Sequence, residues 1–328
     1  MKVMNSHFTN ANATGMLAAI VITTFIFHPR KPHTMHRRQF HLHALSACAA
    51  VAALPLTACS TAQNQSASEP WSRIEKQSTG RMGIAVLDTA DGKLEGQRLD
   101  ERFPMCSTFK WLAAAHVLQR VDQGREQLDR RIRFERKALI EYSPITEPQA
   151  GKNGMTLAEL CHAAITVSDN TAANLILETL GGPQGMTAFA RSLGDEVTRL
   201  DRWEPDLNES KPGDPRDTTS PRAMATLLQQ LVLGDVLSPR SRELLVQWMR
   251  ATSTNRNRLA AGLPEGWKIG SKTGSSGTGS VNDVGVFWPP NRPPIIAAVY
   301  ITQGTSSTKS IEPAIAAVAQ QITRGAAR

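Results

Sequence analysis

Strand-like segments lie at both ends of the body of this sequence, and helix-like segments fill its middle. Near the first end, residues 81–103 have the pattern of a hairpin: an apolar run, a turn at Asp91-Gly92 and a more polar strand. Near the other end, strand patterns return from Trp267, and a last helix is predicted over about 311–323. Strands from both ends can share one antiparallel sheet only if the helical middle is an inserted second domain.

The sequence therefore predicts an α/β part plus an all-α part, in which an antiparallel sheet is flanked by terminal helices and interrupted by a helical insertion. Thr156 and Glu159 form a capping box at the start of one inserted helix. Two Ser-Pro pairs have the pattern of an N-cap followed by proline at the first helical position: Ser220-Pro221 and Ser238-Pro239. The expected bounds are about 70–103 and 255–328 for the α/β part and about 104–254 for the helical part. A cleft between the two parts is the natural place for a site.

The N-terminal segment accounts for most of the positive charge. The chain has 37 Lys and Arg residues, 29 Asp and Glu residues and a net charge of +8. The first 59 residues hold five of the basic residues and no acidic one, so 32 basic and 29 acidic residues follow. No basic stripe with interleaved aromatic residues remains in the body, and we expect no nucleic-acid partner.

Histidine is scarce in the body. Six of the eight histidines lie in the first 59 residues, and only His116 and His162 follow. We interpret both as packed or half-exposed helix residues. A zinc hydrolase needs at least three good protein ligands, and a Ser-His-Asp triad needs a well-placed histidine. The sequence therefore predicts chemistry that runs largely without histidine.

Residues 35–60 have the pattern of an export signal. Arg37-Arg38 and the next residues, Gln and Phe, resemble a twin-arginine signal, and the apolar run after them is too short to span a membrane. We therefore expect export to the periplasm. Another apolar run lies upstream over 16–27, which suggests that translation starts at Met35 and that residues 1–34 are not part of the product.

The four residues LTAC, which end at Cys59, resemble a lipoprotein cleavage box and would place a lipid on Cys59. The alternative is ordinary cleavage after a small residue nearby. We divide the chain into a leader over 1–59, a short linker over 60–69 and a catalytic region over 70–328. The lipid would be the only contact with the membrane, and we expect a monomer.

The stretch MCSTFKWLAAAHVLQ places Ser107 at the start of an apolar helix and Lys110 three residues later. Residues at this spacing share a helix face, so the amine can approach the hydroxyl. The positive end of the helix dipole favours an alkoxide at this point, and a lysine of lowered pKa could take the serine proton. Taken alone, capping by Ser107 is the better explanation, because such a tetrapeptide is common.

Ser168, Asp169 and Asn170 form a second short motif between two predicted helices. Ser168 could relay a proton to a departing amine, with help from Lys272. Asn170 could hold an amide side chain of a substrate. The same tripeptide is also typical of an ordinary turn between helices.

Lys272, Thr273 and Gly274 end a predicted strand and form the third motif. Lys272 and Thr273 could bind a carboxylate, and the backbone of Gly274 and Ser275 could lie close to an acyl group. Each motif alone is weak evidence. Their order and their places on these elements together indicate one catalytic site.

These three motifs, Ser-x-x-Lys, Ser-Asp-Asn and Lys-Thr-Gly, resemble those of the serine β-lactamases and penicillin-binding proteins. The resemblance covers about residues 70–325. It implies a two-domain, transpeptidase-like fold with the site between the domains. It also implies an oxyanion hole formed by the N–H groups of Ser107 and Ser275.

The segment RWEPDLNE resembles the Ω-loop of class A β-lactamases. In this resemblance Glu204 activates the hydrolytic water and Asn208 helps to orient it. Arg202 and Asp217 match the ion pair that closes the loop, and Pro205 matches a cis proline. An acyl-serine ester is long-lived unless a base activates water beside it, so these residues favour a hydrolase.

Two further positions relate to the substrate. The strand after Lys-Thr-Gly carries an arginine in many class A enzymes, and here that position is Val281. Arg258 matches the place from which some members supply the guanidinium instead. Tyr142 matches the aromatic residue at the site entrance, and Ser275 is associated with broader handling of cephalosporins and sometimes carbapenems.

Cys106 and Cys161 are the cysteines that follow Cys59, and we predict that both are buried and unpaired. In several carbapenem-hydrolysing relatives the residue that matches Cys106 forms a disulfide, whose partner position here is Ser276. Cys161 matches half of another family disulfide, whose partner position here is Ala114. Neither family disulfide can form in this chain, and the missing first one argues against carbapenem hydrolysis.

The resemblance implies a class A serine β-lactamase that opens penicillins and cephalosporins through an acyl-Ser107 intermediate, with no metal or organic cofactor, and confers resistance. Deacylation is assigned to Glu204, whereas acylation could use Lys110 or Glu204 through water. Two alternatives are a D,D-peptidase (penicillin-binding protein) and a non-hydrolytic β-lactam sensor. Both would stay acylated, and Glu204 with Asn208 argues against them.

Overall fold

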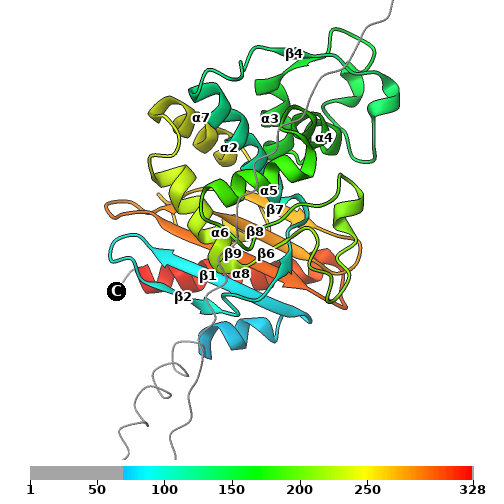
Figure 1. Ribbon diagram of the computed structural model, residues 1–328. Coiled ribbons are helices and arrows are strands. Elements are labelled where there is room, and N and C mark those ends of the chain that lie inside the picture. Colours follow the sequence, from blue (N-terminus) through cyan, green and yellow to red (C-terminus); the bar gives the residue numbers. More distant parts are fainter. Residues whose placement is uncertain (1–68, 327–328) are drawn as a thin grey trace, which may run out of the picture. The chain divides into compact units, whose positions relative to one another are not determined.

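The computed structural model describes residues 69–326, which contain a five-stranded antiparallel sheet and a group of helices (Figure 1). The strands of the sheet are β1 (Arg81–Asp88), β2 (Leu94–Gln97), β7 (Lys268–Ser275), β8 (Val281–Trp288) and β9 (Ile295–Thr302). Their spatial order is β2-β1-β9-β8-β7. Strand β1 pairs along its whole length with β9, from Arg81 opposite Thr302 to Asp88 opposite Ile295. The prediction that both ends of the body share one antiparallel sheet is therefore confirmed.

The α-helices between β2 and β7 form the insertion. They are α2 (Phe109–Asp122), α3 (Leu157–Thr166), α4 (Asn170–Thr179), α5 (Gly182–Ser192), α6 (Pro221–Leu228) and α7 (Pro239–Arg250). Two short ladders pair β3 (Phe103–Pro104) with β6 (Thr218–Thr219), and β4 (Arg131–Ile132) with β5 (Met155–Thr156). The closing helix, α8 (Thr308–Ala326), is longer than the predicted one and contacts β8.

Consecutive apolar residues along a strand contribute alternately to two separate cores, because side chains alternate between the two faces of a strand. On β9, Ile296, Ala298 and Tyr300 join the large core shared with the inserted helices. The intervening Ala297 and Val299 join a second core with α8. Helix α6 packs against β1 and β9, and Figure 1 shows it and α8 on opposite sides of the sheet.

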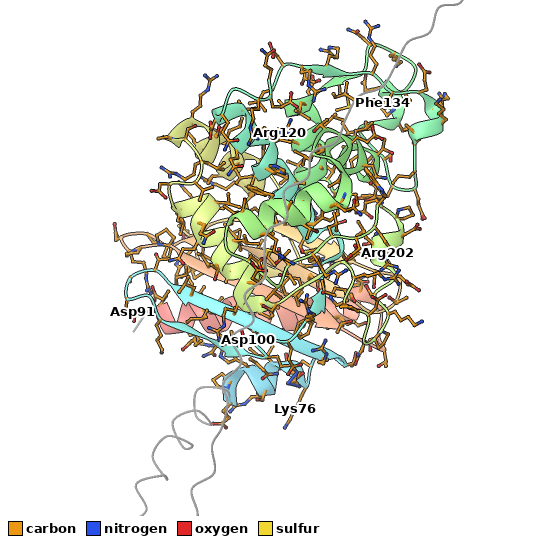
Figure 2. The ribbon with its side chains drawn as sticks, in the orientation of Figure 1. Lys76, Asp91, Asp100, Arg120, Phe134 and Arg202 are labelled. Atoms are coloured by element: carbon orange, nitrogen blue, oxygen red, sulfur yellow. The ribbon has the colours of Figure 1, made fainter. Side chains whose placement is uncertain are left out.

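Several local predictions are confirmed. Thr156 and Glu159 make both hydrogen bonds of the capping box, and the side chains of Ser220 and Ser238 cap α6 and α7. The hairpin turn falls at Gly92, which has a φ of +73° and donates its N–H to Asp88 O at 2.9 Å. Figure 2 shows Asp91 at this end of the sheet.

Other features differ from the sequence analysis or lie outside the described residues. Residues 69–75 are helical, although no element was predicted there, and Trp71 packs in the core with α8. The predicted leader over 1–59 and nearly all of the linker lie outside the described residues. Within 69–326, no helix is long and apolar enough to cross a membrane.

Candidate active site

Ser107 lies in a 3₁₀ turn (Cys106–Thr108) that leads directly into α2, so the α-helix begins two residues later than predicted. Cys106 adopts a φ of +46°, an uncommon conformation for a residue with a Cβ, and such backbone strain is concentrated at functional sites. Ser107 Oγ donates a hydrogen bond to Glu204 Oε1 at 3.1 Å. The serine is therefore held against a carboxylate rather than against the lysine on its own helix.

Lys110 is fully buried beneath Ser107. Its Nζ lies 3.0 Å from Glu204 Oε1, 2.6 Å from Asn170 Oδ1 and 2.9 Å from the Ser168 carbonyl oxygen. Burial lowers the pKa of Lys110, and the negative charge of Glu204 acts in the opposite direction. Ser107 and Lys110, which the sequence places on one helix, thus meet at a single oxygen of Glu204.

Ser168 lies in the turn between α3 and α4, where its φ is +66°. Lys272 Nζ donates to Ser168 Oγ at 3.0 Å, and Lys110 Nζ donates to the same oxygen at 3.4 Å. The pKa of Lys272 is well below its usual value because of burial, reinforced by the positive charges of Lys110 and Arg258. The Ser168 hydroxyl is therefore positioned between two lysines.

Asp169 was quoted in the second motif without a role, and the structure shows that it anchors the turn. Its buried carboxylate caps α4 through Ala172 N at 2.8 Å and accepts the N–H groups of Ile145 and Thr146, each at 2.9 Å. These bonds join the start of α4 to the segment after Tyr142. An aspartate directly before a helix was the available sequence signal.

The loop that follows α5 positions Glu204. The backbone N–H of Glu204 donates to Asn174 Oδ1 at 3.0 Å, and Asn174 Nδ2 donates back to Glu204 O at 2.9 Å. Asn208 Nδ2 donates to Glu204 Oε2, so the two carboxylate oxygens face different partners. The Glu204–Pro205 peptide bond is cis, as predicted. Asn174 was missed by the sequence analysis because it lies in the middle of α4, outside every motif.

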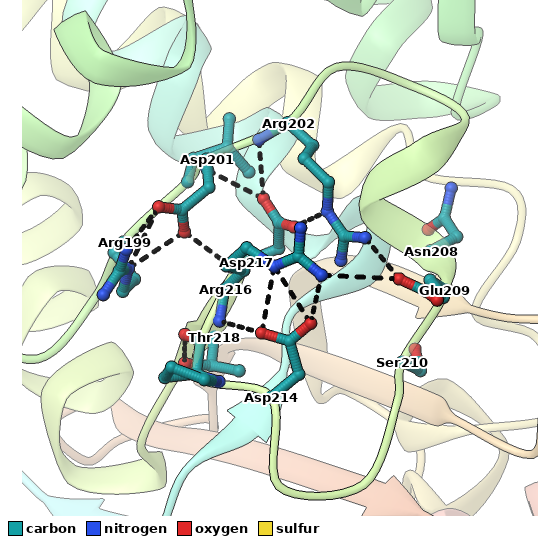
Figure 3. A network of polar contacts seen from close by, with 12 residues as sticks. Arg199, Asp201, Arg202, Asn208, Glu209, Ser210, Asp214, Arg216, Asp217 and Thr218 are labelled. Carbon is teal, nitrogen blue, oxygen red and sulfur yellow. Dashed lines mark hydrogen bonds and ion pairs between the residues drawn. The ribbon is translucent and has the colours of Figure 1, made fainter.

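The predicted ion pair closes this loop. Arg202 Nε lies 2.6 Å from Asp217 Oδ2, and the Asp217 carboxylate also accepts the N–H groups of Asp201 and Arg202. Asp217 N in turn donates to the Asp201 side chain at 3.0 Å. Figure 3 shows these contacts, with Arg216 and Asp214 forming a second pair beside them.

Strand β7 forms the other wall of the site. A Cβ added at Gly274 would lie 2.7 Å from Met105 O and 3.2 Å from Ser107 N, so glycine allows this strand to pass close to the nucleophile. Thr273 Oγ1 lies 2.6 Å from Thr254 Oγ1, a contact that no sequence motif indicated.

Arg258 reaches this wall from the segment before β7. It is 5% exposed, and its guanidinium donates to Ser275 Oγ at 2.7 Å and to the Gly274 and Asn282 carbonyl oxygens at 2.9 and 2.7 Å. Glu312 of α8 pairs with its Nε at 3.1 Å. Val281 instead points into the apolar core with α8.

These elements enclose a cavity of about 310 Å³. Its lining residues are Ser107, Tyr142, Ser168, Asn170, Asn208, Thr254, Arg258, Thr273, Gly274 and Ser275. Lys110, Glu204 and Lys272 are buried next to them, so the structure brings together all twelve predicted site residues. Tyr142 remains 57% exposed. Within the described part of the chain, no cluster of three or more His, Cys, Asp or Glu residues could hold a metal ion.

Cys106 and Cys161 are buried and unpaired, as predicted. Burial raises the pKa of Cys106 to about 12, which keeps it a thiol. Its Sγ contacts Ser210 Oγ at 3.6 Å, on the Glu204 side of the site.

Because neither thiol is oxidised, dithiothreitol should leave the melting temperature unchanged. A native disulfide contributes about 2–4 kcal/mol, which corresponds to a fall of several degrees on reduction. Differential scanning calorimetry with and without the reductant measures this difference. A fall of about 5 °C or more would contradict the assignment of two free thiols.

Comparison with known proteins agrees with this geometry. Residues 67–325 match the model of the family described as "Beta-lactamase enzyme family". Beta-lactamase CTX-M-97 of Escherichia coli is 46% identical over 279 residues, covering 84% of this chain and 95% of that protein. The carbapenem-hydrolyzing beta-lactamase KPC of Klebsiella oxytoca is 45% identical over 266 residues, covering 81% and 90%.

Solved structures are similar as well. The structure titled "Ancestral (GNCA) Beta-lactamase class A" has a TM-score of 0.78 and 58% identity, covering 79% of this chain and 99% of that one. The putative class A enzyme PenP of Rhodopseudomonas palustris has the same TM-score at 55% identity, covering 79% and 99%. The fold and these comparisons thus define a hydrolase that acts on β-lactam amide bonds. This chain belongs to the class A β-lactamases.

Proposed function

We propose that this protein hydrolyses β-lactam antibiotics, and so confers resistance to them, by acylation and deacylation of Ser107. The observation that supports this most directly is the shared carboxylate oxygen. Glu204 Oε1 lies 3.1 Å from Ser107 Oγ and 3.0 Å from Lys110 Nζ. A base within hydrogen-bond reach of a nucleophile is the geometry that nucleophilic catalysis requires.

In the acylation step, Ser107 Oγ attacks the lactam carbonyl carbon and its proton passes to Glu204. We assign the base to Glu204 because the three nearest partners of Lys110 Nζ are acceptors: Glu204 Oε1, Asn170 Oδ1 and the Ser168 carbonyl oxygen, all nearer than Ser168 Oγ at 3.4 Å. An ammonium has three N–H donors and no acceptor, so this environment suits the protonated amine. Lys110 then stabilises the carboxylate and does not take the serine proton.

The tetrahedral intermediate has its negative charge on the former carbonyl oxygen. The N–H groups of Ser107 and Ser275 are the proposed donors to this oxygen. The close passage of β7 at Gly274 supports this assignment, because it places the strand beside Ser107 N. The carbon–nitrogen bond then breaks, and the lactam nitrogen takes a proton from Ser168 Oγ.

The two lysines complete the proton transfers of the acylation step. Lys110 contacts both Glu204 Oε1 and Ser168 Oγ, so the proton on Glu204 can return to Ser168 through it. Lys272 holds the Ser168 hydroxyl in place for the transfer. At the end of the step Glu204 is ionised again, Ser168 is a neutral hydroxyl, and Ser107 is esterified.

Deacylation uses the same carboxylate. Glu204 takes a proton from a water that Asn208 helps to orient, and the hydroxide attacks the ester carbonyl carbon. The ester bond breaks, Ser107 Oγ takes the proton back from Glu204, which is again ionised, and the ring-opened acid leaves. Thr273, Ser275 and Arg258 are proposed to bind the substrate carboxylate, Asn170 its amide side chain, and Tyr142 to border the entrance.

The test is to mix the purified protein with a chromogenic cephalosporin and to follow absorbance together with intact mass. Many turnovers per enzyme, with a transient adduct on Ser107, are the expected result. A single stoichiometric burst followed by a stable adduct would instead identify a penicillin-binding protein or a sensor.

We also propose that the protein is a monomer in the periplasm, exported by the twin-arginine route. Arg37-Arg38 and the apolar run after them support the route, and the LTAC box supports a lipid on Cys59. Size-exclusion chromatography with light scattering measures the oligomeric state.

Expression in a Gram-negative host should yield a membrane-associated form whose N-terminal residue is a lipidated Cys59. Changing Cys59 to Ala should release the protein into the soluble periplasmic fraction without loss of specific activity, because every residue of the proposed site lies within residues 69–326. Intact mass spectrometry of the mature protein identifies both the N-terminus and the lipid. A wild-type mature protein that begins at another residue and has no added mass would refute the lipid assignment.

A further inference from the structure

Asp283 is a buried carboxylate that the proposed mechanism does not use. It lies on β8 opposite Thr273 of β7, and it is 0% exposed. Its Oδ2 accepts the N–H of Leu259 at 3.1 Å, and Oδ1 has no partner within hydrogen-bond distance among the described residues. The Ser271 side chain on β7 also interacts with this carboxylate and favours its charged form. Burying a carboxylate that is only partly hydrogen-bonded is costly, so its presence beside the site needs an explanation.

The charged groups that act on Asp283 are cations of the substrate site. Arg258 directly precedes Leu259 in the chain, and Lys272 lies on β7. Both of these side chains are buried, and both act electrostatically on Asp283. Beyond them, Glu312 of α8 pairs with Arg258 Nε, and Lys110 and Glu204 act on Lys272. The negative charge of Asp283 opposes the lowering of the Lys272 pKa that burial and the neighbouring cations cause. Asp283 therefore contacts the turn at Arg258 and Leu259, which we call the Arg258 turn, and its negative charge compensates the positive charges of Arg258 and Lys272.

We propose that Asp283 is a positioning residue: it fixes the Arg258 turn through the Leu259 N–H and supplies the buried negative charge that keeps Arg258 and Lys272 ready for an anionic substrate. This inference rests on the proposed role of Arg258 in binding the substrate carboxylate. The inference applies to a site of this kind, in which the position of Val281 has no arginine and Arg258 supplies the guanidinium. The guanidinium here reaches β7 from a loop, and the loop is tied to β8 by Asp283.

The pH dependence follows from the same geometry. Burial raises the pKa of Asp283 to about 6, and Arg258 opposes this rise. Binding of anionic substrates should therefore weaken as the pH falls through about 6, where Asp283 becomes neutral. The free energy of unfolding should change with pH in the opposite direction to substrate binding. The folded protein binds this proton more tightly than the unfolded chain does, so the contribution of Asp283 to the unfolding free energy falls as the pH rises towards 6.

The variant Asp283→Asn separates these effects because it preserves shape and one acceptor while removing the charge. The kcat/KM of this variant for a cephalosporin with a free carboxylate should fall about tenfold at pH 7, mostly because KM rises. A tenfold change corresponds to the same free energy as a shift of one pKa unit. The methyl ester of the same cephalosporin should be hydrolysed equally well by both proteins. The preference of the wild type for acid over ester should decline between pH 7 and 5, and that of the variant should stay flat. The melting temperature of the variant at pH 7 should not decrease, because the raised pKa of Asp283 means that the folded protein is less stable with this side chain ionised than with it neutral.

Arg258→Ala provides the reference for these measurements. If it loses the preference for the acid and Asp283→Asn keeps it, the inference about Asp283 is wrong and the proposed function stands. If Arg258→Ala keeps the preference, the carboxylate role of Arg258 is wrong and the inference fails with it. Equal losses on acid and ester in Asp283→Asn, with a lower melting temperature, would show a structural role only.

Discussion

Replacing Glu204 with glutamine should convert this hydrolase into a protein that is acylated and does not turn over. The amide cannot take a proton from the hydrolytic water, and loss of a general base costs about 10²–10⁴-fold in rate. Because Glu204 Oε1 also contacts Ser107 Oγ, acylation should slow as well. Loss of the Glu204 charge also lowers the pKa of Lys110, which can then act as the acylation base in the variant, so acylation should slow less than deacylation. We expect steady-state kcat to fall about 10³-fold, with the acyl-Ser107 adduct as the dominant species.

Intact mass spectrometry after mixing with a cephalosporin measures the adduct, and absorbance measures turnover. Asp206→Asn is the matched control, since it removes a carboxylate from an exposed position on the same loop. It should keep nearly all activity. A Glu204→Gln variant that hydrolyses as fast as the control, without a trapped adduct, would place the deacylating base elsewhere.

Replacing Asp217 with alanine should give the largest loss of stability. Its side chain is fully buried, and its removal leaves Arg202, only 18% exposed, with the half-exposed Glu209 at 2.6 Å as its remaining ion-pair partner. Loss of one member of a buried pair costs about 3–5 kcal/mol, partly because the N–H groups of Asp201 and Arg202 also lose their acceptor. This corresponds to a fall in melting temperature of about 10 °C. The loop should also hold Glu204 less firmly, so deacylation should slow.

The control for this prediction is Asp214→Ala on the same loop. Asp214 pairs with Arg216, which is 46% exposed, and an exposed pair contributes about 1 kcal/mol or less. Its variant should melt close to the wild type. Equal melting temperatures for the two variants would mean that the Arg202–Asp217 pair does not hold the loop.

The local features of this protein could be predicted because short segments determine them. The turn at Gly92, the capping box of Thr156 and Glu159, and the N-caps at Ser220 and Ser238 each depend on residues within a few positions of one another. The boundary at Ser107 was less accurate. The chain makes a 3₁₀ turn there before the α-helix, since Cys106 is held in an uncommon conformation by the surrounding structure.

The order of the motifs, the sheet shared by the two ends of the body, and the residue types of the site could all be read from the sequence. How those side chains meet depends on packing between elements. Ser107 lies 97 positions from Glu204, yet they share a hydrogen bond. The support from Asp169 and Asn174, and the placement of Asp283 beside Arg258, likewise depend on packing. Periodicity and capping record interactions within one element, whereas a site assembled from several elements depends on how their faces pack together.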